Sequence, residues 1–287
     1  MRFAYYPGCT AKGSTQEVDI ASRAVASHLG IDLVELVDAG CCGSCEIKAV
    51  NPDLHLMLNA RIMALANEQD LELLTVCDTC QANLVATARV LDRDQAKRSD
   101  IVERLRRTGV NYTQPPRTRH FARVLLEDVG LQKLSEKVVK PLSGIRVASF
   151  ACCHTFRGDG KDDRNRGLLE RVTEITGADI VPVRVDGDCC GFHILMVNDE
   201  LAVRAAGKFL SRCKDEGVDC IITSSPLCHT AFDIYQNAAE IALDRKINVP
   251  VLHFEQLLGL SLGIRPKRLG LERHVVSVKS LTSKVAA

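Results

Sequence analysis

The sequence predicts an α/β fold with two pseudo-repeated βαβ-type modules, each built on a parallel sheet. Short apolar runs alternate with amphipathic helical segments along most of the 287 residues, which is typical of βαβ units. Nine of the thirteen cysteines recur in the same order and with similar spacing in the two halves. The length suits one large domain or two of ordinary size, and a hydrophobic fraction of 46% indicates a globular chain.

In the first half, three predicted strands each precede a predicted helix. The first helix has Ser14 or Thr15 as its N-cap and Gly30 just past its end, since hydroxyl side chains favour helix starts and glycine favours helix ends. The second helix has Asn51 as its N-cap and Pro52 at its first position. The predicted strands are 2–8, 31–37 and 71–77, and the predicted helices are 14–30, 51–69 and 79–94.

The second half repeats this order after a charged helical linker that a TQPPRT loop interrupts. We therefore predict an N-terminal module over 1–91, a linker over 92–142, a C-terminal module over 143–265 and a tail over 266–287. The predicted strands are 144–150, 178–185, 219–225 and the start of 249–263, and the predicted helices are 165–177, 199–217, 227–244 and the rest of 249–263.

Charge and composition exclude several classes of function. The net charge of +1 comes from 37 basic and 36 acidic residues, and aromatic residues make up only 4%, so we expect no nucleic-acid partner. No run of 18 apolar residues and no signal-peptide core occur, so we expect a cytoplasmic protein that is not an integral membrane protein. Thirteen cysteines in a reducing compartment indicate metal or redox chemistry rather than disulfides.

The first cysteine set contains five thiols. Cys9 is followed by 31 residues and then Cys41 and Cys42, and 34 further residues lead to Cys77, which opens a C-x-x-C motif with Cys80. Because the carboxyl ends of parallel strands meet at one edge of a sheet, we expect these thiols to lie together. A structural zinc site takes four ligands, so five thiolates with an adjacent pair better suit a multi-iron cluster.

The second set lacks one thiol of the repeat. Cys153 is followed by 35 residues and then Cys189 and Cys190, and 34 residues later Ser225 stands where the repeat places a cysteine, before Cys228. A hydroxyl is a poorer ligand for iron than a thiolate. Four thiols still suit a cubane cluster, a binuclear cluster or zinc, and these alternatives stay open.

Two further cysteines lie beside the motifs and are candidate additional ligands, Cys45 and Cys152. If the strand before Cys153 continues as far as Cys152, the two side chains point to opposite faces of the sheet. Isolated cysteines such as Cys213 and Cys220 are predicted to fill the core.

Three histidines lie within three residues of the second set, at His154, His193 and His229. Such side chains can tune a cluster or pass a proton to a leaving thiolate, so His154 and His229 are candidate catalytic residues. The alternative is that they cap helices or fill polar gaps. His120 and His253 are predicted to be structural.

The repeated pattern of one cysteine, a CCG and a C-x-x-C resembles the CCG-domain family. The segments YYPGCT, AGCCG, CDTCQANL, KPLSGIRVASF, CCGF, SPLCHTAFD and VLHFEQLLGL are similar to family segments over nearly the whole chain. The resemblance is greatest to the B-type subunit of heterodisulfide reductase, especially the B-type subunits of heterodisulfide-reductase-like sulfur-oxidising complexes.

The resemblance implies a noncubane [4Fe-4S] cluster at the complete motif and a second iron–sulfur cluster, noncubane, cubane or smaller, at the other. Ser225 departs from the family pattern, which weakens the symmetric mechanism in which two like clusters split a disulfide, and either Cys152 or Ser225 is a candidate fifth ligand. Asp78 replaces the usual proline of the first C-P-x-C, whereas Pro226 keeps it in the second. The implied cluster ligands are Cys9, Cys41, Cys42, Cys77 and Cys80 in the first module and Cys153, Cys189, Cys190 and Cys228 in the second.

The resemblance also implies an oxidoreductase that acts on sulfur groups within a larger complex. Its implied partners are a ferredoxin-like C-type subunit, a flavin-binding A-type subunit and a lipoate-binding sulfur carrier protein. One alternative is an electron-transfer CCG subunit of a flavin-dependent hydroxy-acid or glycerol-phosphate dehydrogenase, although the ferredoxin-type cysteine segments common in those proteins do not occur here. Another alternative is a zinc-stabilised scaffold.

Overall fold

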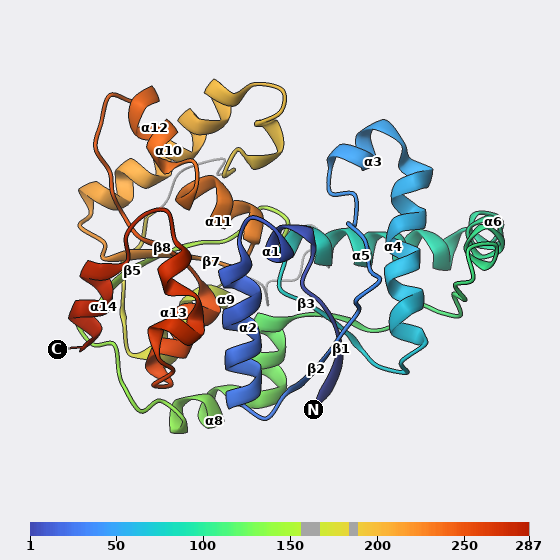
Figure 1. Ribbon diagram of the computed structural model, residues 1–287, viewed down its shortest axis with the longest axis horizontal. Coiled ribbons are helices and arrows are strands. Elements are labelled where there is room, and N and C mark those ends of the chain that lie inside the picture. Colours follow the sequence, from blue (N-terminus) through green and yellow to red (C-terminus); the bar gives the residue numbers. More distant parts are fainter. Residues whose placement is uncertain (156–166, 184–188, 287) are drawn as a thin grey trace. The chain divides into compact units, whose positions relative to one another are not determined.

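The structure, a computed structural model, describes residues 1–155, 167–183 and 189–286. These residues form two compact units, each built round one four-stranded parallel sheet (Figure 1). The units do not follow the halves of the sequence, because short segments of each half belong to the other unit. The first unit contains residues 1–9, 26–121 and 154–155, and the second contains residues 10–25, 122–153, 167–183 and 189–286.

The first sheet has the strand order β2-β1-β3-β4, with all strands parallel. Its strands are β1 Arg2–Tyr6, β2 Asp32–Glu35, β3 Leu73–Thr75 and β4 Thr118–His120. Strand β1 is central, where Tyr5 pairs with Glu35 on one side and with Leu74 on the other. Helical connections join parallel strands, so the loops that follow the strands gather at one edge of the sheet.

Helices α4 and α6 of the first unit begin at clear capping signals. The Asn51 side chain accepts a hydrogen bond from the backbone N–H of Leu54, and Pro52 is the first helical residue, which confirms the predicted start. Asp94 caps the following helix in the same way by accepting from the backbone N–H of Lys97. The helices are α3 Glu46–Val50, α4 Pro52–Asn67, α5 Asp78–Arg93 and α6 Gln95–Arg106.

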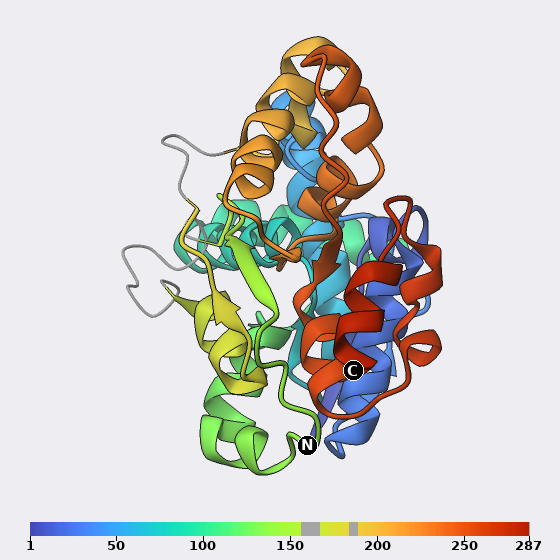
Figure 2. The ribbon, with the colours of Figure 1, turned by 90° about the vertical axis from the view of Figure 1, so that its left-hand side faces the viewer.

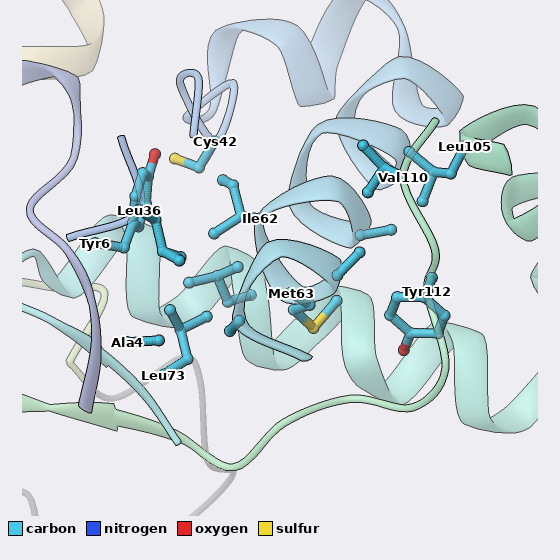
Figure 3. Packing of buried hydrophobic residues seen from close by; sticks show 14 of the residues in the cluster. Ala4, Tyr6, Leu36, Cys42, Ile62, Met63, Leu73, Leu105, Val110 and Tyr112 are labelled. Atoms are coloured by element: carbon cyan, nitrogen blue, oxygen red, sulfur yellow. The ribbon is translucent and has the colours of Figure 1, made fainter. Parts of the chain in front are cut away.

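A buried apolar cluster combines residues of β1, β3, α4, α5 and α6 (Figure 3). Ile62, Met63 and Leu73 are at most 1% exposed within it. Cys42 and Tyr6 belong to the same cluster, and Figure 3 shows the Tyr6 hydroxyl on the side where the Cys42 sulfur lies. The core of this unit therefore forms one wall of the first cysteine site.

The second sheet has the order β6-β5-β7-β8, and its strands are again parallel. Its strands are β5 Arg146–Phe150, β6 Asp179–Ile180, β7 Cys220–Thr223 and β8 Val251–His253. Central β5 pairs Val147 with Ile180 on one side and with Cys220 on the other. The two sheets thus share one strand order, which confirms the predicted α/β fold with two repeated modules.

The α-helices of the second unit vary in length, and α10 is the longest of them. They are α9 Leu168–Thr176, α10 Asp199–Asp215, α11 Pro226–Asp233, α12 Gln236–Ala242, α13 Phe254–Ser261 and α14 Lys279–Ala286, with short 3-10 turns η3 Phe192–Ile194, η4 Pro266–Leu269 and η5 Leu271–Arg273. Helices α10 and α12 pack against each other (Figure 2), and α9 packs against α13.

Helix α2, Gln16–His28, follows β1 in the sequence but begins in the second unit. Within that unit the Ser22 hydroxyl donates to the Glu255 carboxylate over 3.2 Å, and the Glu17 carboxylate lies 3.1 Å from the His229 imidazole. Burial makes such polar contacts specific, because an unmatched partner is costly. Two other helices span a change of unit, α1 Cys9–Lys12 and α7 Phe121–Arg123, and π-helix η1 Val124–Gly130 and α8 Leu131–Glu136 follow within the second unit.

Two differences from the predicted elements have local physical causes. Strand β4 was not predicted, because it contains three residues at a sheet edge and follows the two prolines of the TQPPRT loop. The helix predicted over 227–244 is divided into α11 and α12, because the N–H groups of Ile234 and Tyr235 both bond to the Thr230 carbonyl, at 3.0 and 3.3 Å. Residues 165–166 of a predicted helix and residues 184–185 of a predicted strand lie outside the described residues.

Candidate metal centres

The first cysteine set lies in the loops that follow three neighbouring strands. Cys9 begins α1 three residues after β1, and the doublet of Cys41 and Cys42 follows β2. Cys77, two residues after β3, is the N-cap of α5, and Cys80 lies in the first turn of that helix. Because β2, β1 and β3 are adjacent in the sheet, their carboxyl ends bring all five thiols to one edge.

The five thiols make an unbroken path of contacts. The Cys9 sulfur lies 3.3 Å from that of Cys41, and the Cys80 sulfur lies 3.5 Å from that of Cys42. Hydrogen bonds also join the side chain of Cys41 to that of Cys42, and that of Cys80 to that of Cys77. The sequence-predicted set is therefore brought together in one place.

Backbone and amide groups direct hydrogen-bond donors at these sulfurs. The N–H of Gly43 lies 3.4 Å from the Cys41 sulfur, and the N–H of Ser44 lies 3.4 Å from the Cys42 sulfur. Gly43 and Ser44 both have left-handed backbone conformations, with φ of 82° and 50°, and glycine adopts this region without strain. Successive N–H groups aimed at one point stabilise negative charge on sulfur, as a thiolate ligand requires.

Hydrogen bonding and burial separate the pKa values of these thiols. Hydrogen bonds from Cys41 and Cys80 hold the pKa of the Cys42 thiol well below its usual value. The pKa of the Cys80 thiol lies well above its usual value, because that thiol donates to Cys42 and Cys77 and is buried. Negative charge therefore concentrates on the inner sulfur of the doublet.

Two side chains near this site were not identified from the sequence. The Asn83 amide nitrogen lies 3.7 Å from the Cys42 sulfur and 3.1 Å from the Ser44 carbonyl oxygen. Burial and the surrounding cysteines raise the pKa of Tyr6, whose hydroxyl donates to the Gly40 carbonyl over 2.9 Å. Asn83 follows the last cysteine by three residues in a helix, and this spacing is a sequence signal for a shared face.

Other polar residues of the first unit contact one another. The Cys45 sulfur lies 3.3 Å from Nε2 of His154, so both candidates meet each other. The buried Asp78 carboxylate accepts a hydrogen bond from the Thr155 hydroxyl over 2.9 Å and lies 3.9 Å from the His120 imidazole. The departure from proline at position 78 thus provides a buried anchor at the start of α5.

The second cysteine set repeats most of these contacts. The Cys153 thiol hydrogen-bonds to that of Cys189, the thiols of Cys189 and Cys190 bond to each other, and Cys190 bonds to Cys228. Hydrogen bonds from Cys153 and Cys190 lower the pKa of the Cys189 thiol to about 2. Gly191, with φ of 80°, donates its N–H to the Cys189 sulfur at 3.4 Å.

Cys152 joins this second set, contrary to the orientation expected from a continuing strand. Strand β5 ends at Phe150, so the alternation of side chains between faces does not extend to Cys152 and Cys153. The buried Cys152 thiol hydrogen-bonds to the thiols of Cys153 and Cys228. Five thiols therefore lie together in the second unit as well.

The buried imidazole of His229 faces acidic side chains rather than solvent. Its Nε2 lies 3.1 Å from the Glu17 carboxylate, and its ring centroid is 5.1 Å from that of His274. Asp233 accepts hydrogen bonds from the backbone N–H groups of Val275 and Val276, at 2.8 and 3.0 Å.

Cys213 and Cys220, predicted to fill the core, are fully buried.

The comparisons with known proteins agree with this repeated geometry. Residues 3–85 and 147–233 each match the family model described as CCG, cysteine-rich domain. The chain belongs to the CCG cysteine-rich domain family. It carries two copies of the domain, and each copy contributes one of the thiol sets described above.

Relatives of this CCG protein match it over nearly its full length. It is 34% identical to the 8-methylmenaquinol:fumarate reductase membrane anchor subunit of Wolinella succinogenes, covering 97% of this chain and 98% of the relative. It is 29% identical to the B-type subunit of the ferredoxin:CoB-CoM heterodisulfide reductase of Methanosarcina mazei, covering 99% and 97%. The described helices of this chain include none that is long and apolar enough to cross a bilayer.

A solved structure shares the fold of the CCG protein. The crystal structure of a hypothetical protein from Helicobacter pylori superposes with a TM-score of 0.78 at 16% identity, over 97% of this chain. The chain spans about half of that structure, 52% of its length. This likeness supports the fold alone.

The donor chemistry of both sites fits iron–sulfur ligation. Each site offers five thiols linked by successive contacts, and thiolates are the ligands that hold iron–sulfur clusters. The two cysteine-rich domains therefore each provide a thiol set whose chemistry suits an iron–sulfur cluster.

Proposed function

We propose that the CCG protein is an iron–sulfur subunit of a heterodisulfide-reductase-like complex that makes or breaks bonds between sulfur atoms. Its first site, with Cys9, Cys41, Cys42, Cys77 and Cys80 as ligands, would hold a noncubane [4Fe-4S] cluster. Its second site would hold another iron–sulfur cluster. When bound, such clusters supply one-electron steps that divide a two-electron disulfide reaction.

The observation that carries this proposal is the unbroken path of five thiols in the first unit. Four ligands complete a structural metal site, so a fifth sulfur in contact with the others supports a larger cluster. The N–H groups of Gly43 and Ser44 and the Asn83 amide hold negative charge on the sulfurs.

Exposure differs across the first site and supports a direction of approach. Cys42, Cys77 and Cys80 are buried, whereas Cys9 and Cys41 are exposed. The buried side excludes water from the iron ligands, and the exposed side leaves room for a sulfur substrate. We assign His154 to proton transfer near this site, because its imidazole lies beside the Cys45 thiol.

The complex would contain the partners of the heterodisulfide reductase type. These are a ferredoxin-like C-type subunit, a flavin-binding A-type subunit and, for a sulfur-oxidising complex, a lipoate-binding sulfur carrier protein. The chain's relatives are themselves named as subunits of reductases, which supports a role within an assembly. We place the complex in the cytoplasm.

The first test measures the metal content and the response to a thiol. The full chain is purified without oxygen, and iron, sulfide and zinc are quantified alongside an EPR spectrum. We expect roughly eight irons when both sites are filled, and zinc without iron would contradict the proposal. Dihydrolipoamide enriched in a nuclear-spin-bearing sulfur isotope should broaden the EPR signal of the oxidised protein, because its sulfur would bind iron.

A second candidate function is quinol-linked electron transfer without sulfur chemistry. The similarity to the 8-methylmenaquinol:fumarate reductase subunit favours it, and it shares the electron relay with the dehydrogenase alternative. The two functions differ in their response to substrates. Reduction of the clusters by a menaquinol analogue, with an EPR signal that dihydrolipoamide leaves unchanged, would favour this second function.

A further inference from the structure

The last cysteine of each module has a different set of thiol partners. In the first module, Cys80 bonds to Cys42, the inner member of the doublet, and to Cys77, which opens the C-x-x-C motif. In the second module, Cys228 bonds to the inner member of its doublet and to Cys152. Cys152 therefore makes the contact that Cys77 makes in the first module.

The residue before the first cysteine of each module explains how this exchange fits. In the first module that residue is Gly8, and a Cβ placed on it would lie 3.2 Å from the Cys80 sulfur. A side chain at this position is therefore directed at the last cysteine of its module. In the second module the same position is Cys152, whose thiol bonds to Cys228.

Ser225 has the same backbone conformation as Cys77, its counterpart in the first module, but its side chain does not make the contacts that Cys77 makes. Ser225 has φ of −122° and ψ of 127°, close to the −127° and 116° of Cys77, and both residues are N-caps. The Cys77 sulfur accepts from the N–H of Cys80 over 3.5 Å. The Ser225 hydroxyl is fully buried, makes no capping bond and has no hydrogen-bond partner among the residues that the structure describes.

We propose that Cys152 is the fifth thiolate ligand of the second cluster, in place of the residue at position 225. Cys152 occupies the position of Gly8 in the first module, and Ser225 occupies the position of Cys77. The cysteine therefore stands at the other one of these two positions in the second module. The ligand moves from the end of β7 to the end of β5, and these strands are adjacent in the sheet. Thiolate binds iron better than a hydroxyl does, so the exchange restores a full soft donor set.

This inference deepens the proposed function and rests on the second site binding an iron–sulfur cluster. The experiment uses the full chain, purified and reconstituted without oxygen, and measures iron, sulfide and the EPR components of both sites. We expect Cys152→Ser to lower the iron content to about half by emptying the second site. Ser225→Ala should leave the iron content and the spectrum unchanged.

A double variant separates loss of a ligand from loss of folding. Cys152→Gly combined with Ser225→Cys recreates the arrangement of the first module, so it should bind as much iron as the wild type. Cys213→Ala is the matched control for removing a buried thiol from the same unit.

The outcomes distinguish the inference from the proposed function. Full iron content in Cys152→Ser, with loss in Ser225→Ala, would make the serine the ligand and overturn the inference alone. Full iron content in both variants would also overturn it. Wild-type protein that binds no iron would overturn the inference and the proposed function together.

Discussion

The two modules share one frame but supply their fifth thiol from different strands. Both sheets have the same strand order, and each central strand leads to the first cysteine of its set. In the first module the contact to the last cysteine comes from Cys77 after β3, and in the second it comes from Cys152 after β5. The repeat therefore preserves the number of thiols at the site rather than the position of each one.

The surroundings of the two doublets also differ. In the first module the thiol with the lowered pKa is the buried Cys42, and in the second it is the exposed Cys189. Asn83 donates to the first doublet, whereas the matching residue three positions after Cys228 is Ala231. Two sites with the same number of clustered thiols thus differ in how deeply the thiol with the lowered pKa is buried.

Removing the inner member of each doublet should have the largest effect. Cys42→Ala and Cys190→Ala each remove a thiol that contacts two others, so each should empty its own site and lower iron content to about half. Iron analysis and EPR of anaerobically purified variants measure this. If either variant lost all iron, the two sites would not be independent.

Replacing the glycine that follows each cysteine doublet, Gly43 or Gly191, should lower the stability of the protein by different amounts. A Cβ on Gly191 would lie 2.6 Å from the Ala202 carbonyl oxygen, and one on Gly43 would lie 3.0 Å from Cβ of Ile47. Both residues have positive φ, so we expect Gly→Ala to lower the free energy of unfolding by roughly 1–3 kcal/mol, more at Gly191 than at Gly43.

Thermal unfolding of the anaerobic protein measures this difference. Gly144→Ala is the control, because its φ is also positive but its Cβ would meet no atom of the described residues within 4 Å. Equal losses at Gly191 and Gly144 would show that backbone strain alone, without the contact to Ala202, sets the effect.

Exchanging the amide donor between modules should shift redox potentials by a smaller amount. A hydrogen bond to sulfur stabilises the more negative, reduced cluster, so Asn83→Ala should lower the midpoint potential of the first site only. The reciprocal Ala231→Asn should raise that of the second. A redox titration followed by EPR measures both, and equal shifts at the two sites in Asn83→Ala would contradict the assignment.

The smallest effects belong to the cysteines outside the frame. Cys213→Ala and Cys220→Ala should leave the iron content and both EPR components unchanged. These two thiols, on α10 and β7, are buried and fill the core. A loss of iron in either variant would show that the second site extends farther than the contacts of Cys152 and Cys228 indicate.

Much of the fold follows from local signals in the sequence. Asn51 and Pro52 start α4 as expected, and Gly30 stands past the end of α2 with φ of 72°. Strand β4 could not be predicted, because three edge residues after two prolines are too few to show a periodic hydrophobic pattern. The break after α11 depends on the shared Thr230 carbonyl, which no local pattern specifies.

The clustering of the cysteines could be predicted from their spacing, because the loops that follow parallel strands meet at one edge of the sheet whatever the sequence between them. The contacts that each thiol makes could not be predicted in this way. The contact between Cys152 and Cys228 depends on β5 ending at Phe150, two residues earlier than a continuing strand would reach. The pairing of His229 with Glu17 joins residues far apart in the sequence, so spacing gives no indication of it.

The position of α2 has a consequence for how the protein is synthesised. Its Ser22 hydroxyl bonds to Glu255, 233 positions later in the chain, and its Glu17 pairs with His229. On the ribosome this helix is made long before the residues that bury its polar side chains. A nascent chain therefore carries Glu17 and Ser22 without their buried partners until His229 and Glu255 have been made.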